Sequence, residues 1–425
     1  MTLRAGFAET DITPAVGTRK IGWIKKLIAE NVRDPLSARI GIFESNESCL
    51  GFVSLDTLSI RWTQVDEIRR RVEKQYGLPG SGVMVAATHN HAGPAVANLG
   101  DVQRDEKYVE DLTEKVVHGF GQALNSLEDA ELAFGHDFEF EVSHNRRVVM
   151  RDGTVKTHGR FSNPLALCFE GPINPEVAVL AARDLDGNLL GCLVNFTCHP
   201  THHGNGPDLS AGYPGALARS MKKQDCPVTV FLNGASGNIH DADPRTGRGR
   251  QPEEIGEILT RDVVDILGIV EWSTNFELNA TSRTVQLPFR EPTEDQIQGT
   301  VEGAQRFVDP EVYDRMMPRV LKRINKMGQQ PAEVQVLRAG DTAWVGVPAE
   351  YFVQLGLRIK EDTWPDHTLI VGHANGMVGY VPHAEAFKRG GYETTFSNHS
   401  RLAPEAGDML ADCAVELVKK SGLSR

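Results

Sequence analysis

The sequence predicts an α/β protein in which mixed β-sheets are covered by helices. Apolar segments with the length of strands alternate with amphipathic helical segments along the chain. Several of these apolar segments end directly in short loops that carry histidine or glycine. No repeat of fixed period, low-complexity tract or linker rich in Pro, Gly or Ser interrupts the 425 residues. One continuous domain over 1–425 is therefore expected.

In the first third, apolar runs predict strands and charged amphipathic stretches predict helices. Gly77 stands where a helix would end, because glycine readily adopts the left-handed conformation found after a last helical turn. The expected elements are a strand at 49–60, a helix at 65–76, a strand at 83–87, a helix at about 106–127 and a strand near 131–142.

The middle of the chain opens on a hairpin signal. Asp186-Gly187-Asn188 separates two apolar runs, and an Asp-Gly pair tolerates the positive φ angles of a tight turn. The expected elements are strands at 177–185 and 189–196, a helix at 214–223 and a strand at 228–232.

The last third mixes helices with alternating strands. A hairpin is expected across Gly340-Asp341, and the two helical stretches before it suggest a small helical subdomain at 291–330. The expected elements are a helix at 252–269, strands within 276–289, helices within 294–327 and a helix at 351–360.

Composition excludes several classes of partner. The net charge is −12 and no long run of Lys and Arg occurs, so no basic face for nucleic acid is expected. No window approaches the roughly 20 apolar residues that span a bilayer, and the N-terminus lacks the apolar core of a signal peptide. The six cysteines form no Cys-x-x-Cys pair, which favours a reducing compartment. We expect a cytoplasmic protein that acts on a small molecule. The oligomeric state stays open.

Histidines gather where apolar strands end. His89 and His91 follow the strand at 83–87, and His199 follows the strand at 189–196, with His202 and His203 close behind. Side chains two residues apart in an extended segment point to the same side, so the His-x-His pair can present both rings to one ligand. With no thiolate cluster, such a site would favour zinc or a similar divalent ion. Taken singly, each histidine is also explained as an ordinary hydrogen-bonded imidazole.

Two other segments have less specific explanations. The loop 233–238 lacks the Gly-x-Ser-x-Gly spacing of a hydrolase nucleophile, so a tight turn that brings backbone amides toward a ligand is the better interpretation. Glu350 lies between a strand and a helical stretch, where an acidic residue is also explained by the helix dipole.

A set of short blocks, in order along the chain, resembles the catalytic domain of the neutral, non-lysosomal ceramidase family. Each block alone is unspecific, whereas their common order is fairly specific. The main blocks are Ala87–Pro94, Asn195–Thr201, Phe231–Ala235, Val347–Glu350 and Gly379–Val381, with Ala8–Pro14 and Asp34–Arg39 before them.

The resemblance implies one catalytic zinc ion held by two histidines, a glutamate and a tyrosine. It places His91 beside the metal rather than on it, and it implies active-site roles for Arg146 and Tyr392, with Gly22 near the site. The implied zinc ligands are His89, His199, Glu350 and Tyr380.

Three differences separate this chain from the ceramidase pattern. His240 stands where the family has a serine at the active centre, so we expect the chain either to use His240 and Asp241 instead or to act on a different bond. Gly22, Asn238 and Asp241 are expected to bind the substrate. The chain ends soon after the last block, so no C-terminal immunoglobulin-like domain is expected. It also lacks an export signal.

These observations together predict a zinc-dependent hydrolase in which metal-activated water attacks the carbonyl of an amide, an ester or a lactone in a small polar substrate. A true ceramidase is the alternative within the family. A non-catalytic, metal-containing binding protein is the alternative from another class.

Overall fold

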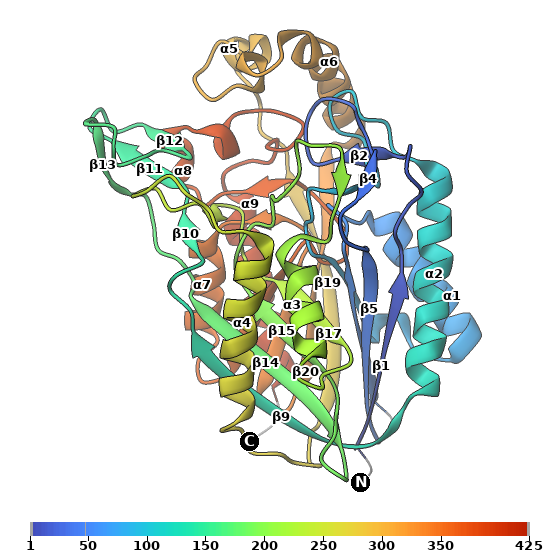
Figure 1. Cartoon of the computed structure of the whole chain (residues 1–425). Helices are drawn as coiled ribbons and strands as arrows, with labels where there is room; N and C mark the ends of the chain where they lie inside the picture. Colours follow the sequence, from blue (N-terminus) through green and yellow to red (C-terminus); the bar gives the residue numbers. More distant parts are fainter. Residues whose placement is uncertain (1–2, 47, 423–425) are drawn as a thin grey trace.

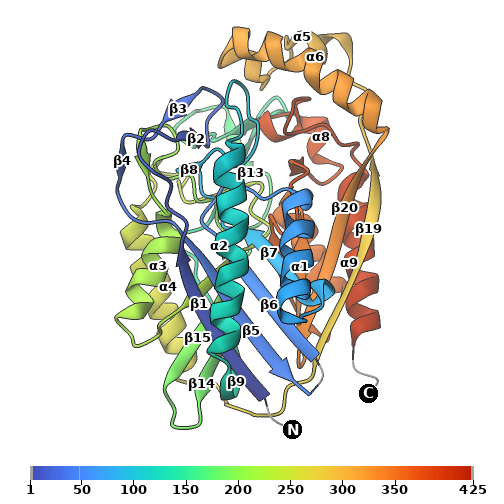
Figure 2. The ribbon, with the colours of Figure 1, turned by 90° about the vertical axis from the view of Figure 1, so that its right-hand side faces the viewer.

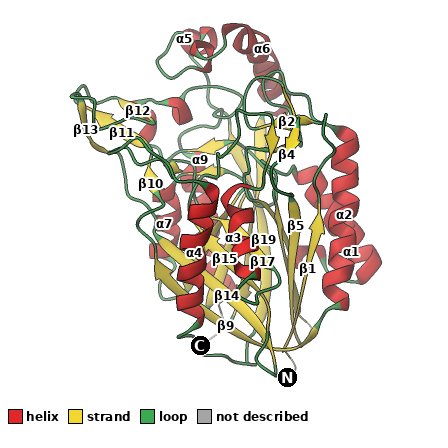
Figure 3. Ribbon diagram, viewed as in Figure 1, coloured by secondary structure: helices red, strands yellow, loops and turns green. Residues whose placement is uncertain are grey.

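The computed structural model describes residues 3–46 and 48–422, and its centre is a pair of mixed β-sheets that pack face to face (Figures 1 and 3). The larger sheet has the strand order β17-β15-β14-β9-β1-β5-β6-β7. Its strands are β1 (Leu3–Asp11), β5 (Ser37–Ser45), β6 (Ser48–Leu55), β7 (Val83–Ala87), β9 (Glu128–Phe138), β14 (Glu176–Asp184), β15 (Leu189–Phe196) and β17 (Thr229–Asn233).

The smaller sheet has the order β19-β20-β21-β23. Its strands are β19 (Leu278–Pro288), β20 (Gln329–Ala339), β21 (Thr342–Val347) and β23 (His367–Gly372). Phe52 of the larger sheet meets Trp344 of the smaller one edge to face, with ring centroids 5.7 Å apart, and both side chains are fully buried. Aromatic pairs of this geometry contribute beyond the area that they bury.

Helices cover the outer faces of both sheets, as Figure 2 shows for α1 and α2. Helices α3 and α4 cover the β14-β15-β17 part of the larger sheet, and α7 and α9 cover the smaller sheet. The bounds are α1 (Trp62–Tyr76), α2 (Glu106–Asn125), α3 (Gly212–Lys222), α4 (Pro252–Leu267), α7 (Val353–Asp362) and α9 (Ala406–Ser421). The predicted fold class, mixed sheets covered by helices, is confirmed.

Shorter elements build the end of the molecule at which the functional loops lie. Helices α5 (Glu294–Gln298) and α6 (Pro310–Met327) lie across this end, at the top of Figures 1 and 2. The others are β2 (Arg19–Ile21), β3 (Leu27–Ile28), β4 (Asn31–Val32), β8 (Gly93–Pro94), β10 (His144–Asn145), β11 (Arg147–Met150), β12 (Val155–Thr157), β13 (Ala166–Phe169), β16 (Asp208–Leu209), β18 (Ile239–His240), β22 (Glu350–Tyr351), β24 (Tyr380–Val381) and α8 (Ala386–Arg389).

Local sequence explains most of the agreement with the expected elements. Gly77 ends α1 with a φ of 76°, and its amide donates to the carbonyl of Glu73, as expected for a glycine cap. The turn at Asp186-Gly187 joins the antiparallel strands β14 and β15. None of the helices in the described part of the chain combines the length and the apolar character that a membrane-spanning segment needs.

Candidate metal centre

Parallel strand pairs bring the histidine-bearing loops to one end of the sheets. β6 pairs with β7, β15 with β17 and β21 with β23, each in parallel, so the carboxyl ends of the two strands in a pair lie together. Backbone hydrogen bonds then connect the loops: the amide of His91 donates to the carbonyl of Pro200, and that of His373 donates to the carbonyl of Ala349.

Three imidazole rings meet at this end. His91 Nε2 lies 3.3 Å from His89 Nε2 and 3.2 Å from His199 Nε2. His89 and His199 are buried, whereas His91 is half-buried at the edge of a cavity. The ligand atoms of the three rings all lie within 4.8 Å of one another, a spacing that could hold one metal ion.

The hydrogen bonds on the far side of each ring fix which nitrogen faces the centre. Each Nδ1 contacts a backbone carbonyl oxygen, at 2.8 Å for His89, 2.9 Å for His91 and 3.2 Å for His199. A carbonyl can only accept, so Nδ1 carries the proton and Nε2 of the neutral ring presents a lone pair. Burial, followed by the proximity of His89, lowers the pKa of His91 to about 3 and holds that of His199 well below its usual range, so both rings are neutral near pH 7.

This arrangement fits a divalent metal ion. Three lone pairs that point at one another are unfavourable unless a cation lies between them. Nitrogen ligands around a tetrahedral zinc ion, each bonded at about 2.0–2.1 Å, stand about 3.3–3.4 Å apart, close to the observed separations. The resemblance alone places His91 outside the ligand set, whereas the geometry groups its Nε2 with those of His89 and His199.

Glu350 and Tyr380 complete the centre from the smaller sheet's side. They pair directly across the parallel strands β22 and β24. Glu350 Oε2 lies 3.4 Å from His89 Nε2 and 3.9 Å from His199 Nε2. Burial alone would raise the pKa of Glu350, but His89, His373 and a hydrogen bond from Tyr380 hold it well below its usual range. The carboxylate is therefore charged and available as an oxygen ligand.

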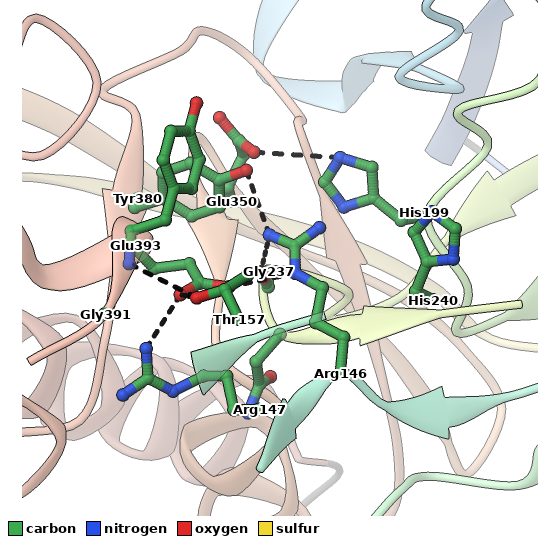
Figure 4. A network of polar contacts seen from close by, with 12 residues as sticks. Arg146, Arg147, Thr157, His199, Gly237, His240, Glu350, Tyr380, Gly391 and Glu393 are labelled. Atoms are coloured by element: carbon green, nitrogen blue, oxygen red, sulfur yellow. Dashed lines mark hydrogen bonds and ion pairs between the residues drawn. The ribbon is translucent and has the colours of Figure 1, made fainter. Parts of the chain in front are cut away.

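Arg146 links the centre to a buried ion-pair network (Figure 4). Its Nη2 donates to Tyr380 Oη at 3.1 Å and to the carbonyl of Gly237 at 2.7 Å, and its Nε donates to Glu393 Oε1 at 2.9 Å. Arg147 Nη1 binds the other oxygen of Glu393 at 2.7 Å, and Thr157 Oγ1 donates to that oxygen at 2.7 Å. Glu393 is fully buried, yet the two guanidinium groups lower its pKa to about 2 against the cost of burial.

His240 lies in the same cavity on the short strand β18. The amide of Ala242 lies 2.9 Å from His240 Nδ1, and His240 Nε2 forms a hydrogen bond with Thr201 Oγ1 at 2.8 Å. Asp241 Oδ1 lies 3.0 Å from the same Nδ1. His240 is thus held between a hydroxyl and a carboxylate, and its ring stands perpendicular to that of His158 with centroids 4.8 Å apart.

Two residues expected to bind substrate have other neighbours. Asn238 is fully buried and caps helix α7: its Oδ1 accepts from the amide of Val353 at 2.9 Å, and its Nδ2 donates to Gln354 Oε1 at 2.8 Å. The Asp241 carboxylate accepts from the amide of Arg250 at 3.1 Å. Neither residue lines the cavity in the described part of the chain, so their side chains support the loop that carries His240.

The cavity has a volume of about 940 Å³ and opens over the three imidazole rings. Gly22, Arg146, His240 and Tyr392 all line it, as do Glu350 and Tyr380. The Tyr380 and Tyr392 rings meet edge to face with centroids 5.6 Å apart. The structure therefore brings the residues expected at the site together, apart from Asn238 and Asp241.

Sequence reasoning missed His373 and Glu393. His373 stacks on His89 with ring centroids 4.0 Å apart and planes only 7° from parallel, and neither of its ring nitrogens has a hydrogen-bond partner among the described residues. It follows strand β23 directly, which is the same pattern that singled out His89 and His199. Glu393 carried no such signal.

A second group, His136, Glu176 and His367, also has metal-like spacing. Lys360 and His367 already bind the Glu176 carboxylate, the latter at 2.7 Å. This group therefore forms an ion-pair network of its own, and none of its members lines the cavity.

Gly22 fixes the position of His91, and Gly22→Ala is expected to disturb it. Gly22 has a φ of 144°, and a Cβ added there would lie 1.9 Å from the carbonyl oxygen of His91. The carbonyl of Gly22 also accepts from His91 Nδ1. We expect a loss of about 2–4 kcal/mol in the free energy of unfolding, measured by chemical denaturation.

Gly17→Ala is the matched control for this substitution. Gly17 has a φ of 93°, but an added Cβ would meet no atom of the described residues within 4 Å. It therefore carries the backbone strain without the clash. Equal losses in the two variants would show that contact with His91 is unimportant.

No protein-family model matches the chain. The neutral ceramidase of Pseudomonas aeruginosa is 24% identical over 383 aligned residues, which cover 74% of this chain and 56% of that protein, so the chain matches little more than half of the ceramidase's length.

Solved structures extend the likeness to the whole chain. The crystal structure of the Pseudomonas aeruginosa neutral ceramidase superposes with a TM-score of 0.76 at 20% identity, covering 100% of this chain and 76% of that one. A ceramidase complexed with C2 gives the same TM-score and identity, with 77% of its chain covered. The chain is therefore similar in sequence to a neutral ceramidase and shares the fold of the solved ceramidase structures.

Proposed function

We propose that the chain is a metal-dependent hydrolase that cleaves a carbonyl compound, an amide, an ester or a lactone. One observation carries this proposal: three inward-facing Nε2 atoms and the Glu350 carboxylate converge at the base of a 940 Å³ cavity. The similarity to neutral ceramidase supports a hydrolase of the amidase type.

The proposed ligands are His89, His199, Glu350 and Tyr380, and His91 lies beside them with the lone pair of its Nε2 available for a proton. Zinc is the metal that this nitrogen and oxygen set favours. A bound zinc ion supplies water of lowered pKa and polarises a carbonyl oxygen.

The chain's own residues then position the substrate and move protons. Arg146, buried and held by Glu393 and the carbonyl of Gly237, presents Nη2 to the hydroxyl of Tyr380 at the cavity wall. We propose that this guanidinium and the hydroxyl of Tyr392 stabilise the negative charge that develops on the carbonyl oxygen, because preorganised donors act strongly in a water-poor site. His91, in its neutral form, accepts and returns the proton that passes from nucleophile to leaving group.

By the sequence resemblance His240 stands where the ceramidase family has a serine, and we propose that it takes part in substrate positioning. Its Nε2 hydrogen bond to Thr201 and its contact with Asp241 hold the ring against the cavity. An imidazole there narrows the cavity beside Arg146 compared with a serine. Cleavage of ceramide itself remains the second candidate, favoured by the apolar cavity walls at Trp23, Trp62 and Leu99.

We further propose that 1–425 acts as one catalytic unit, with 291–330 as a helical subdomain that completes the cavity wall. Val308 and Arg323 from this segment line the cavity together with residues of the sheet loops. Lys25 and Asp309 form an ion pair at 3.3 Å, and Arg315 and Asp101 form another at 2.7 Å, which ties α6 to those loops.

Metal content and substrate scope together test the proposed function. Purified protein is expected to contain close to one equivalent of zinc and to hydrolyse at least one member of a panel of N-acyl amides, aryl esters, sugar lactones and a short-chain ceramide. A chelator should abolish turnover, and added zinc should restore it. Turnover that survives complete metal removal would contradict the proposal. Turnover of the ceramide alone would favour the second candidate.

A further inference from the structure

Three arginines from distant parts of the chain line one region of the cavity. Arg61 precedes helix α1, Arg323 lies on α6, and Arg401 lies in the loop before α9. Burial lowers the pKa of Arg61 and of Arg401, and the positive charge of Arg323 lowers both further, after that of Arg104 in the case of Arg61. The fold therefore gathers positive charge beside the candidate metal centre.

These guanidinium groups lack acidic partners within the described part of the chain. None of the three forms an ion pair shorter than 4.0 Å. Glu106 influences Arg61 from a distance, but its carboxylate pairs with Arg104 at 3.1 Å. Burial and Arg323 lower the pKa of Arg401 to about 9, which indicates a charge that its surroundings leave uncompensated.

Arg401 is the most informative of the three because it is only 3% exposed. Its Nη1 donates to the carbonyl of Asn398 and its Nη2 to Gln330 Oε1 at 3.1 Å, so neutral groups orient it. Its Nε has no hydrogen-bond partner among the residues that the structure describes. A buried guanidinium with a free donor is costly unless a ligand satisfies it.

The charge of the residues that line the cavity is opposite in sign to the net charge of the chain. The chain carries a net charge of −12, yet four arginines line the cavity, and among its described lining residues Glu350 is the only carboxylate. A positive cleft in an acidic protein attracts anions and repels cations.

We propose that Arg61, Arg323 and Arg401 bind an oxyanion on the substrate, a carboxylate or a phosphate, and that the substrate is an anionic amphiphile such as an N-acyl amino acid. This inference rests on the proposed hydrolase function for the substrate's scissile bond. The planar guanidinium fork suits both oxyanions. Trp23 and Val308, which are 44% and 51% exposed, offer apolar surface at the cavity for the acyl chain.

The first test is selectivity in turnover. N-dodecanoylglycine, N-dodecanoyl phosphoethanolamine and uncharged N-dodecanoylethanolamine share one chain and one amide. We expect kcat/KM for the better anionic substrate to exceed that for the neutral one by at least about tenfold, mainly through KM. R61Q and R323Q should each reduce the ratio of anionic to neutral kcat/KM toward one. Added salt should also reduce this ratio, because it screens the charges. The preferred anion identifies carboxylate or phosphate as the natural group.

R319Q is the matched control. Arg319 lies on the same helix as Arg323, is exposed and does not line the cavity. Its replacement removes the same charge and should leave the ratio unchanged.

The second test needs no turnover. Binding of dodecanoate, dodecyl phosphate and dodecanol to the full protein is measured by calorimetry. If dodecanoate or dodecyl phosphate binds more tightly than dodecanol, and this difference is lost in R323Q and kept in R319Q, the anion site is supported. This result holds even if no amide is cleaved and the proposed hydrolase function fails. The proposed anion site would be wrong if charged and uncharged amides were hydrolysed at equal rates, or if anion binding were unchanged in R61Q and R323Q. Either result would leave the proposed hydrolase function standing.

Discussion

Replacement of His199 by alanine is expected to remove the bound metal and abolish hydrolysis. His199 contributes one of three clustered Nε2 atoms: that of His91 lies 3.2 Å from that of His199 and 3.3 Å from that of His89. His199 Nε2 also lies 3.9 Å from Glu350 Oε2. Loss of a supporting residue alone lowers metal affinity 10–100-fold, so loss of a ligand should cost more than about 100-fold. A catalytic metal ion stabilises the transition state by several kcal/mol, so its loss should lower turnover by about three orders of magnitude.

Zinc content by elemental analysis and kcat on the best panel substrate measure this effect. His118→Ala is the control, because His118 is exposed on α2 and does not line the cavity. Full metal content in the His199 variant would show that the ligand assignment is wrong.

The second large effect is expected from Glu393→Gln. This substitution leaves the buried guanidinium groups of Arg146 and Arg147 without the carboxylate that holds them at 2.9 Å and 2.7 Å. Breaking a buried ion pair by removing one partner costs about 3–5 kcal/mol. We expect a loss of that size in the free energy of unfolding, together with lower kcat, because Arg146 is no longer fixed against Tyr380.

The stability that Glu393 contributes depends on pH. The pKa of Glu393 falls from an ordinary 4.5 to about 2 in the folded protein. A carboxylate with a lowered folded pKa stabilises the protein fully above pH 4.5, and this contribution is lost as the pH falls from 4.5 toward 2. Between those values the wild type should lose stability more steeply than the Gln variant.

Glu302→Gln is the control for ion-pair loss in general. Glu302 pairs with Lys156 at the surface, where both side chains are about half exposed. Such pairs contribute about 0–1 kcal/mol. A loss as small for Glu393→Gln as for Glu302→Gln would contradict the structural role assigned to the buried network.

Local patterns predicted what depends on neighbouring residues. The strand before His89 matches β7 at both ends, and the Asp186-Gly187 turn joins the expected strands. β5 was not predicted, because Arg39 and Glu44 interrupt its apolar pattern. Arg39 is nevertheless 3% exposed, since Glu9 and Asp56 pair with it at 3.0 Å and 2.9 Å. A compensated buried charge is invisible in sequence.

The residues of the site likewise fall into those that the sequence predicted and those that it did not. His89 and His199 were predicted from strand ends, and the family resemblance supplied Glu350, Tyr380 and Arg146, which the structure brings to one centre. Glu393 and the group of Arg61, Arg323 and Arg401 were not predicted. Their roles depend on the fold bringing together segments more than 75 residues apart in sequence, and no local pattern predicts that.

The position of α6 has an evolutionary consequence. The candidate metal residues come from strand ends that the buried sheets hold rigidly, whereas Val308 and Arg323 come from a helical segment that lies across the sheet ends and forms its own small apolar cluster (Figure 2). Mutations in α6 can therefore reshape the cavity wall without passing through a destabilised core. A scaffold built this way can acquire new substrates by drift in one peripheral helix while its reaction chemistry stays the same.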